Sequence, residues 1–525
     1  MKTLYFNGDI ITMTNQPMPQ AVLCEDETII ATGDYEILKN YSDTEIDLEG
    51  KTMLPAFIDG HSHFTTVANT LAIADLSETE SIDEIKAVLN SFIENKGEIG
   101  EDEFVVGFGY DNNFFPGKKH PTKNDLDEIC PDRPVVISHA SGHMGVANTM
   151  ALSIMGIDKN TPDPEGGRIG RNADGSPNGY LEETAFTANT AVIKQPDYKD
   201  MCRFAAKAQE MYFKYGITTI QDGFTGLKEW DLLKKLSDDK QLVADIVAYV
   251  DINGCPQLLS ENMEYNRKYI NNLKIGGYKL FLDGSPQGRT AWMTSPYENS
   301  DDYCGYPIYS DSKVVNFVKK SVSEKQQLLC HCNGDAAARQ FINAYETADV
   351  QLGTQENFRP VLIHGQLATA KQMEQLNPLG MIASFFVAHT WQWGDIHLEN
   401  FGERGKKICP VKSAIDSGVV TTFHQDTPVL PPDMLHTVWC AVNRVTQNGV
   451  QLDMGESISV YDALKSITVN AAYQYGEENQ KGTVEPGKDA SFVILSANPL
   501  LCDKTEINKI KVVRTILRGK TVYNA

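Results

Sequence analysis

Residues 55 to 64 read Pro55-Ala-Phe-Ile-Asp-Gly-His-Ser-His-Phe64, an apolar run that ends in two histidines one residue apart. In extended backbone, residues i and i+2 point to the same side, so His61 and His63 can reach one metal ion from the end of a buried strand. Imidazole nitrogen is a good ligand for zinc and similar metals. The stretch predicts the kind of metal site that hydrolases use to activate water and polarise a carbonyl. The alternative is a pair of surface histidines in a loop, which the preceding apolar run disfavours.

On the carboxyl side of this stretch, apolar strand-like runs alternate with helical patterns, which is typical of an α/β fold with a parallel sheet. We count eight candidate strands, at residues 53–58, 218–222, 243–251, 277–283, 327–332, 360–364, 381–388 and 419–423. Eight such units predict a (β/α)8 TIM barrel over residues 53–479, with its active site at the carboxyl ends of the strands.

Two further regions complete the predicted organisation. Residues 1–52 and 480–525 both read as short strands joined by turns, and we expect them to pair into one small β domain. Residues 65–215 interrupt the barrel after its first strand. They contain helical stretches at 81–95 and 200–215 and a strand-like run at 133–139. We interpret this insert as a cap or lid over the site.

Composition limits the classes of partner. The chain has 525 residues and a formal net charge of −23, which argues against nucleic acid or an anionic membrane as a partner. The ten cysteines form no CxxC pair, so we expect free thiols in a reducing compartment. No apolar run reaches the length of a membrane span, and no signal-peptide pattern is present. We therefore expect a cytoplasmic protein.

Polar side chains recur where the predicted strands end. Lys279 lies within the fourth strand, His331 and His364 lie near the ends of the fifth and sixth, and His424 and Asp426 follow the eighth. A lone histidine after an apolar strand is more often a packing residue than a ligand. Several at matching ends of one barrel predict, together with His61 and His63, a site for a divalent metal ion.

Lys279 and Asp426 each allow two interpretations. A lysine within an apolar strand is costly to bury as a charge, so Lys279 either pairs with an acid such as Asp283 or is carbamylated and becomes a ligand able to bridge two metals. Asp426 is interpreted as a ligand and as the general base that moves a proton from the attacking water to the leaving amine. The alternative for Asp426 is a cap on the turn before Pro428.

The motifs around these residues resemble the amidohydrolase superfamily of metal-dependent hydrolases, and the resemblance covers nearly the whole chain. It includes Asp59-Gly-His-Ser-His63 and Lys481-Gly-Thr-Val-Glu-Pro-Gly-Lys-Asp-Ala490. The insert and the fourth predicted strand are similar to the YtcJ-like branch, which includes N-substituted formamide deformylases. The motifs that carry this similarity are Ser141-Gly-His-Met-Gly-Val-Ala-Asn148, Gly179-Tyr-Leu-Glu182 and Lys279-Leu-Phe-Leu-Asp-Gly-Ser285.

The resemblance implies a composite β-sandwich beside a distorted barrel, a homodimer, and one or two divalent ions, usually zinc. It implies hydrolysis of amides, formamides or related C–N bonds, with His143 of the insert facing the substrate. The ligands it implies are His61, His63, Lys279, His331, His364 and Asp426, with Lys279 as a candidate carbamylated residue.

Further residues are candidates for contact with the substrate. The family often has Gly-Ser-Asp where this chain has His424-Gln-Asp426, so His424 is expected to add a substrate contact or a proton relay. His389 and Trp391 follow the seventh strand and either line the pocket or pack the loop. Asp283 is included in the same group.

We therefore expect a metal-dependent amidohydrolase in which activated water attacks the carbonyl of an amide or N-substituted formamide and Asp426 shuttles the proton. Two alternatives stay open at this point. One is hydrolysis of a lactone, ester or cyclic amide at the same centre. The other is a catalytically silent metal-binding scaffold.

Overall fold

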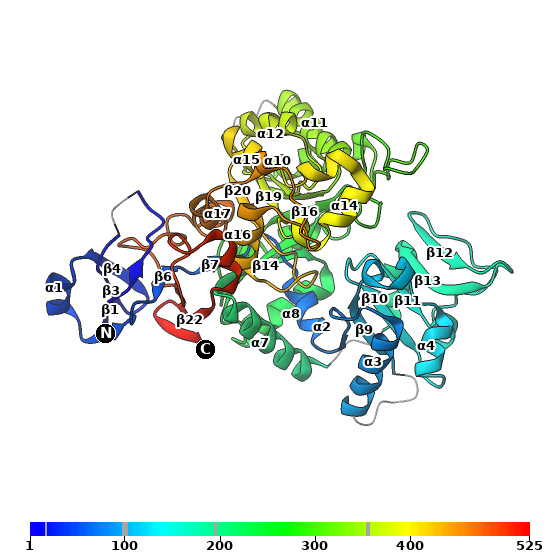
Figure 1. Cartoon of the computed structure of the whole chain (residues 1–525), viewed down its shortest axis with the longest axis horizontal. Coiled ribbons are helices and arrows are strands. Elements are labelled where there is room, and N and C mark those ends of the chain that lie inside the picture. The colour runs from blue at the N-terminus through cyan, green and yellow to red at the C-terminus, as the bar shows by residue number, and fades with distance from the viewer. Residues whose placement is uncertain (16–17, 97–102, 194–196, 353–357) are drawn as a thin grey trace. The chain divides into compact units, whose positions relative to one another are not determined.

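This computed structural model describes residues 1–15, 18–96, 103–193, 197–352 and 358–525, and Figure 1 shows their secondary structure. The chain divides into two compact units, which are treated separately below. The first comprises Met1–Thr65 and Ala208–Ala525, and the second comprises Thr66–Lys207. No helix in the described ranges is both long enough and apolar enough to cross a membrane.

An eight-stranded sheet in which every neighbouring pair is parallel dominates the first unit. Its strands, in spatial order, are β20 (Thr421–Phe423), β19 (Ile382–Phe385), β18 (Val361–His364), β17 (Gln327–Cys332), β16 (Leu273–Phe281), β15 (Asp245–Asp251), β14 (Ile217–Thr225) and β7 (Phe57–Ile58). Each strand overlaps one of the eight predicted ranges. The sheet curls far enough that Gly60 N, just after β7, donates a 3.2 Å hydrogen bond to Phe423 O at the end of β20.

Helices follow most strands of this sheet. Their positions match the sequence signals, as in α12, where Thr369 and Gln372 form a capping box. In α10, the buried residues Val314, Val318 and Val322 recur every four positions and form one face. The helices of this unit are α1 (Tyr35–Leu38), α8 (Leu227–Asp238), α9 (Gln257–Glu261), α10 (Asp311–Ser323), α11 (Asp335–Leu352), α12 (Ala370–Leu376), α13 (His389–Gln392), α14 (Gly394–Phe401), α15 (Val411–Asp416), α16 (Met434–Asn443), α17 (Val460–Ser466) and α18 (Val469–Gln474).

The run predicted as one strand at residues 53–58 forms two strands, so this prediction was wrong in detail. Thr52–Pro55 forms β6, which pairs with β2 and β21 in a separate small sheet, and only Phe57–Ile58 joins the large parallel sheet as β7. Pro55 has no N–H to donate, and the chain changes partners at Ala56, whose N–H binds Ser491 O. The apolar pattern is continuous because both strands are buried.

Strands from both chain ends form two small sheets in the first unit. One sheet has the order β4-β3-β1-β5, with strands Thr28–Gly33, Ala21–Glu25, Lys2–Phe6 and Thr44–Asp47. The other has the order β2-β6-β21-β22-β23, with strands Asp9–Ile10, Thr52–Pro55, Phe492–Leu495, Val512–Leu517 and Lys520–Asn524. One apolar cluster contains residues of both sheets, among them Tyr5, Val22, Met53 and Phe492. Residues from the two ends of the chain therefore share a core.

The second unit contains a six-stranded sheet of order β12-β13-β11-β10-β9-β8, of which the sequence indicated only the strand near residues 133–139. The missed strands are short or contain glycine, as in Val105-Val-Gly-Phe-Gly-Tyr110, which weakens their pattern. The strands are β8 (Ala74–Asp75), β9 (Val105–Tyr110), β10 (Val135–His139), β11 (Met144–Ala147), β12 (Gly167–Arg171) and β13 (Pro177–Glu183). The helices are α3 (Ile82–Lys96), α4 (Lys123–Ile129), α5 (Thr149–Ile154) and α6 (Thr184–Thr187), while α2 (Phe64–Thr70) and α7 (Tyr198–Lys214) cross the unit boundaries.

Candidate metal centre

The carboxyl ends of the parallel strands bring most of the predicted ligands together. His61 and His63 follow β7, and Nε2 of each faces Oδ1 of Asp426, at 3.4 Å and 3.2 Å respectively. Ligand atoms of these three side chains all lie within 4.8 Å of one another. Residues more than 360 positions apart in the sequence thus converge because β7 and β20 are the edge strands that the curl of the sheet brings together.

A second group of histidines adjoins the first. Nε2 of His364 lies 3.1 Å from Nδ1 of His331, and Nδ1 of His364 lies 3.1 Å from Nε2 of His424. Ser384 Oγ is 2.9 Å from the remaining nitrogen of His424. The rings of His61 and His364 are 5.6 Å apart between centroids, so both groups form one cluster.

Lys279 points its amine into this cluster from β16. Its side chain is fully buried, and Nζ lies 2.9 Å from Nε2 of His61. Burial lowers the pKa of Lys279 to about 8, although the nearby Asp426 carboxylate opposes the shift. The structure places Lys279 beside His61 and near Asp426. This position is compatible with both predicted interpretations, pairing with an acid and carbamylation. Asp283 accepts hydrogen bonds from backbone N–H groups, and its Oδ1 also lies 3.5 Å from Nε2 of His331.

The backbone at two predicted ligands has unusual geometry. His364 and Asp426 have φ values of +73° and +54°, a region that side-chain-bearing residues rarely adopt. Close packing also constrains the loop after β7, which carries His61, because a Cβ on Gly223 would lie 2.5 Å from Cε1 of His61. The cluster is therefore held by backbone that only a well-packed surrounding structure can maintain.

The charge states of the clustered side chains favour binding of a cation. Burial keeps the pKa of His61 and His364 well below the usual value and lowers that of His424 to about 3, so these imidazoles are neutral at pH 7. Burial opposes ionisation of Asp426, but the adjacent His364, His63 and His61 outweigh it and hold its pKa well below the usual range. The cluster therefore presents imidazole lone pairs around an ionised carboxylate.

This donor set fits a divalent metal ion. Among the described residues, no group donates a well-formed hydrogen bond to the buried Oδ1 of Asp426, although two imidazole nitrogens face it. A buried carboxylate oxygen without a donor is costly unless a cation satisfies it. Neutral imidazole and carboxylate are also the ligands that zinc prefers. Binding of a metal ion by all six predicted ligands stays a prediction.

The predicted substrate residues have different surroundings. Oδ1 of Asp283 accepts a hydrogen bond from Asn333 N, and its Oδ2 accepts bonds from Trp292 N and Gly334 N. Asp283 therefore holds the loop after β16 against the loop after β17. His424 lies at the cluster, but it is fully buried between Ser384 and His364.

The two aromatic candidates after β19 lie on α13. His389 is 4% exposed, and its Nδ1 lies 3.0 Å from Nε2 of the buried His397. The ring of Trp391 packs edge-on against His436, with centroids 5.1 Å apart. Contact of His389 or Trp391 with a substrate stays a prediction.

His143 lies in the second unit, in the turn between β10 and β11. Its Nδ1 is 2.9 Å from Oε2 of Glu183, and both side chains are partly exposed. Glu183 combines a φ of +51° with a ψ of −124°, and its Oε1 is buried without a hydrogen-bond partner among the described residues. The contact of His143 with the substrate stays a prediction.

Sequence reasoning missed the polar residues Gln221 and Asp222 within β14. Gln221 contacts the ring of His61, and Asp222 accepts hydrogen bonds from Thr65 N and Thr65 Oγ1 at 2.9 Å and 2.8 Å. Both residues support the loop that carries His61 and His63. The signal was present, because Gln221-Asp-Gly223 is a polar stop after an apolar strand, like the stops after the other strands.

Comparisons with known proteins place these features in a family. Residues 44–523 match the amidohydrolase family. The chain is 28% identical to a protein described as a candidate amidohydrolase, YtcJ of Bacillus subtilis (strain 168), over 100% of this chain and 99% of that protein. It is 27% identical to the N-substituted formamide deformylase of Arthrobacter pascens, over 96% of this chain and 95% of that one.

A solved structure extends the likeness to three dimensions. The crystal structure of an uncharacterized metal-dependent hydrolase from Pyrococcus horikoshii OT3 aligns with a TM-score of 0.77 and 25% identity. The alignment covers 96% of this chain and 99% of that chain. The similarity therefore extends over both compact units, and over the ranges that carry the histidine cluster.

Proposed function

Because the chain belongs to the amidohydrolase family, we propose that it hydrolyses a carbon–nitrogen bond in a small molecule, namely an amide or an N-substituted formamide. The coarser conclusion, a metal-dependent hydrolase of the amidohydrolase superfamily, follows from the family match and from the relatives described above. The deformylase of Arthrobacter pascens supports the narrower substrate class.

The observation that carries the proposal is the convergence of His61, His63 and Asp426, in which the buried Oδ1 of Asp426 faces two imidazole nitrogens and has no well-formed hydrogen bond among the described residues. In this proposal the residues that hold one or two divalent ions, with zinc as the expected metal, are His61, His63, Lys279, His331, His364 and Asp426. A bound ion would polarise the substrate carbonyl and make water more acidic.

Asp426 is proposed as the proton shuttle. Its pKa lies well below the usual range, so the carboxylate is ionised at pH 7 and can accept a proton from the attacking water. The same carboxyl group then donates that proton to the nitrogen of the leaving amine. The turn that places Asp426 has a φ of +54°, which fixes its carboxylate toward His61 and His63.

Lys279 is proposed to act in one of two forms. As a carbamate, formed when its neutral amine adds carbon dioxide and releases one proton, it would supply an anionic oxygen to the ions. As an amine it would remain beside His61 Nε2 and offset the charge of Asp426. Both forms use the same buried position on β16.

Architectural predictions accompany this function. We propose that the curled parallel sheet is a closed, distorted (β/α)8 barrel, for which the bond from Gly60 N to Phe423 O is the supporting contact. We propose that the two small sheets form a composite β-sandwich, which their shared apolar core supports. A cytoplasmic homodimer remains a prediction.

Metal content and turnover test the proposal together. Wild-type protein reconstituted with Zn²⁺ should hold one or two ions per chain and hydrolyse members of a panel of N-substituted formamides and amides. Lys279→Met should lower the number of ions or their affinity. Lys274→Met is the matched control, because Lys274 is also buried on β16 but lies at the amino end of the strand.

The outcomes separate the claims. If well-folded wild-type protein binds no Zn²⁺, Co²⁺ or Mn²⁺, the metal centre is refuted. If it binds metal but hydrolyses only esters or lactones, the proposed C–N specificity is wrong. Equal metal content in Lys279→Met and wild type would assign Lys279 to the charge-pairing form.

A further inference from the structure

The ring nitrogen of His61 that faces away from the cluster meets Gln221. Nδ1 of His61 contacts Oε1 of Gln221, and both side chains are fully buried. The other nitrogen, Nε2, faces the amine of Lys279 and the carboxylate of Asp426. Gln221 is therefore in position to decide which nitrogen of His61 carries the proton.

The neighbours of Gln221 determine the orientation of its amide. Nε2 of Gln221 lies 3.0 Å from Gly60 O, a carbonyl that can only accept a hydrogen bond. It also lies 2.8 Å from the hydroxyl of Tyr475, and that hydroxyl donates its proton to Asp59 O at 2.5 Å. The Tyr475 oxygen can therefore only accept from Gln221. Both contacts require the NH₂ group on this side, so Oε1 must face His61.

An acceptor oxygen at Nδ1 requires a proton on that nitrogen. The neutral ring then keeps a lone pair on Nε2, which is the nitrogen that points into the cluster. We infer that Gln221, held by Tyr475, is a positioning residue that fixes His61 as the Nδ1–H tautomer and sets the direction of its Nε2 lone pair. This inference rests on the proposed metal-dependent function, since the lone pair would otherwise have no ion to bind.

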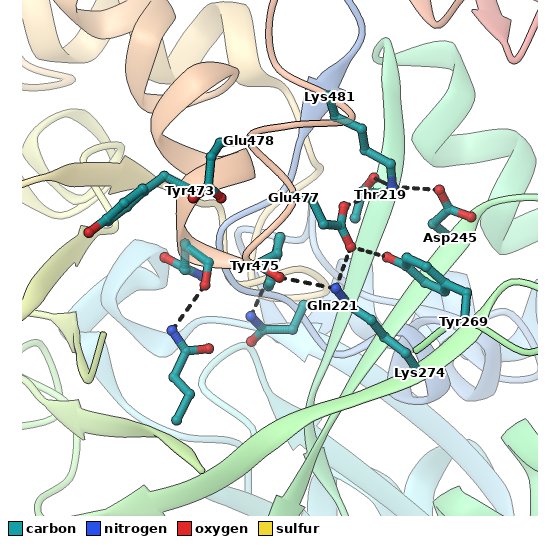
Figure 2. Close-up of polar contacts among 12 residues, drawn as sticks. Thr219, Gln221, Asp245, Tyr269, Lys274, Tyr473, Tyr475, Glu477, Glu478 and Lys481 are labelled. Carbon is teal, nitrogen blue, oxygen red and sulfur yellow. Dashed lines mark hydrogen bonds and ion pairs between the residues drawn. The ribbon is translucent and has the colours of Figure 1, made fainter. Parts of the chain in front are cut away.

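Removing one of these hydrogen bonds should be costly in free energy, because His61, Gln221 and Tyr475 are all buried. Figure 2 shows Gln221 beside Tyr475, and both side chains are buried. Tyr475 follows α18 and lies 254 positions from Gln221 in the sequence. The hydrogen bond therefore links the segment after α18 to β14. A partner of this kind orients a metal-binding histidine, and its loss typically weakens metal affinity about 10- to 100-fold.

Gln474 offers a matched control. It is also a buried glutamine, 1% exposed, and its Nε2 donates to the same Gly60 O at 2.7 Å. Its Oε1 accepts from Thr422 Oγ1 at 2.7 Å instead of from an imidazole. Gln221→Met and Gln474→Met therefore remove similar buried hydrogen bonds, but only the first removes the acceptor at His61.

The first test measures Zn²⁺ affinity by competition with a chromophoric chelator. Gln221→Met should bind Zn²⁺ about 10- to 100-fold more weakly than wild type, while Gln474→Met, at a comparable loss of stability, should change affinity less than about threefold. Tyr475→Phe should give an intermediate loss, because Gln221 keeps its bond to Gly60 O. Equal affinities of Gln221→Met and Gln474→Met would overturn the inference and leave Gln221 a merely structural residue.

A second test needs no metal. In metal-free protein labelled with ¹⁵N-histidine, the His61 signals, identified by their loss in His61→Asn, should show Nδ1 protonated and Nε2 unprotonated. Gln221→Met should shift them toward a mixture of tautomers. A protonated Nε2 in wild type, or an unchanged pattern in the variant, would overturn the inference. Absence of Zn²⁺ binding by wild type would refute the proposed function, while this spectrum still decides the tautomer.

Discussion

The two ends of the parallel sheet both hold buried polar clusters, and they differ in how the charges are paired. At the amino end, Lys481 lies 2.5 Å from Asp245 and 2.9 Å from Glu477, which also binds Lys274 and the hydroxyl of Tyr269 (Figure 2). At the carboxyl end, neutral imidazoles surround Asp426, whose Oδ1 has no donor among the described residues.

The comparison separates structural from functional burial of charge. At the amino end each buried cation has a buried carboxylate, and the pKa of Glu477 falls to about 2 because Lys481 and Lys274 outweigh the effect of its burial. Such a network is complete without a ligand. At the carboxyl end, Oδ1 of Asp426 has no well-formed hydrogen bond among the described residues, so the number of buried polar groups is less informative than whether they satisfy one another.

The largest expected effect is that of Asp426→Asn, which should lower kcat/KM about 10³- to 10⁴-fold, since it removes both a proposed charged ligand and the proposed proton shuttle. The folded structure should be retained, because asparagine has nearly the same size and shape as aspartate. Steady-state kinetics with an N-substituted formamide and calorimetry measure the two effects. Retained activity with a lowered unfolding temperature would show that Asp426 stabilises the fold and does not take part in catalysis.

Glu477→Gln should show the opposite behaviour. It leaves Lys274 and Lys481 buried with less negative charge, so the free energy of unfolding should fall by about 3–5 kcal/mol, while activity per folded molecule is kept. Urea denaturation measures the change. Glu478→Gln is the control, because the partly exposed Glu478–Arg359 pair should contribute less than about 1 kcal/mol. Similar losses in both variants would remove the distinction between buried and exposed pairs.

Gly223→Ala should lower activity by displacing His61 at the carboxyl end of the sheet, although it replaces none of the proposed ligands. The new Cβ would lie 2.5 Å from Cε1 of His61 and 2.8 Å from Ser62 O, so the ring must move. Displacing a reacting group by about 1 Å can lower the rate about 10²-fold. Kinetics and Zn²⁺ affinity should fall together. Gly33→Ala is a control, since its Cβ meets only Leu38, at 4.0 Å, and normal activity in Gly223→Ala would show that the loop can shift freely.

The smallest effect is a difference in pH dependence between the two ends. The folded pKa of Glu477, about 2, lies below its ordinary value of 4.5. Its stabilisation is therefore complete above pH 4.5 and is lost as the pH falls toward 2. Wild type should lose about 2 kcal/mol from this group between pH 5 and pH 3, and Glu477→Gln should lack this part of the slope. Parallel slopes in urea denaturation at the two pH values would contradict the assignment.

Much of the sheet could be predicted from the sequence because its signals are local. Each of the eight strands is an apolar run, and the polar residue at its end, such as His331 or His364, follows directly in the chain. The six-stranded sheet of the second unit was missed because its strands are short or contain glycine. The division of residues 52–58 between two sheets was missed because burial on both sides leaves no mark in the apolar pattern.

The sequence by itself determined the membership of the amidohydrolase family, the order of the strands and the identity of the candidate ligands, since these depend on residue type and position along the chain. Only the tertiary structure decided which polar groups meet. It placed Asp283 on backbone N–H groups and His389 against His397, and it brought Tyr475 to Gln221 across 254 residues. Hydrogen bonding acts over about 3 Å in space, so separation along the chain carries little information about it.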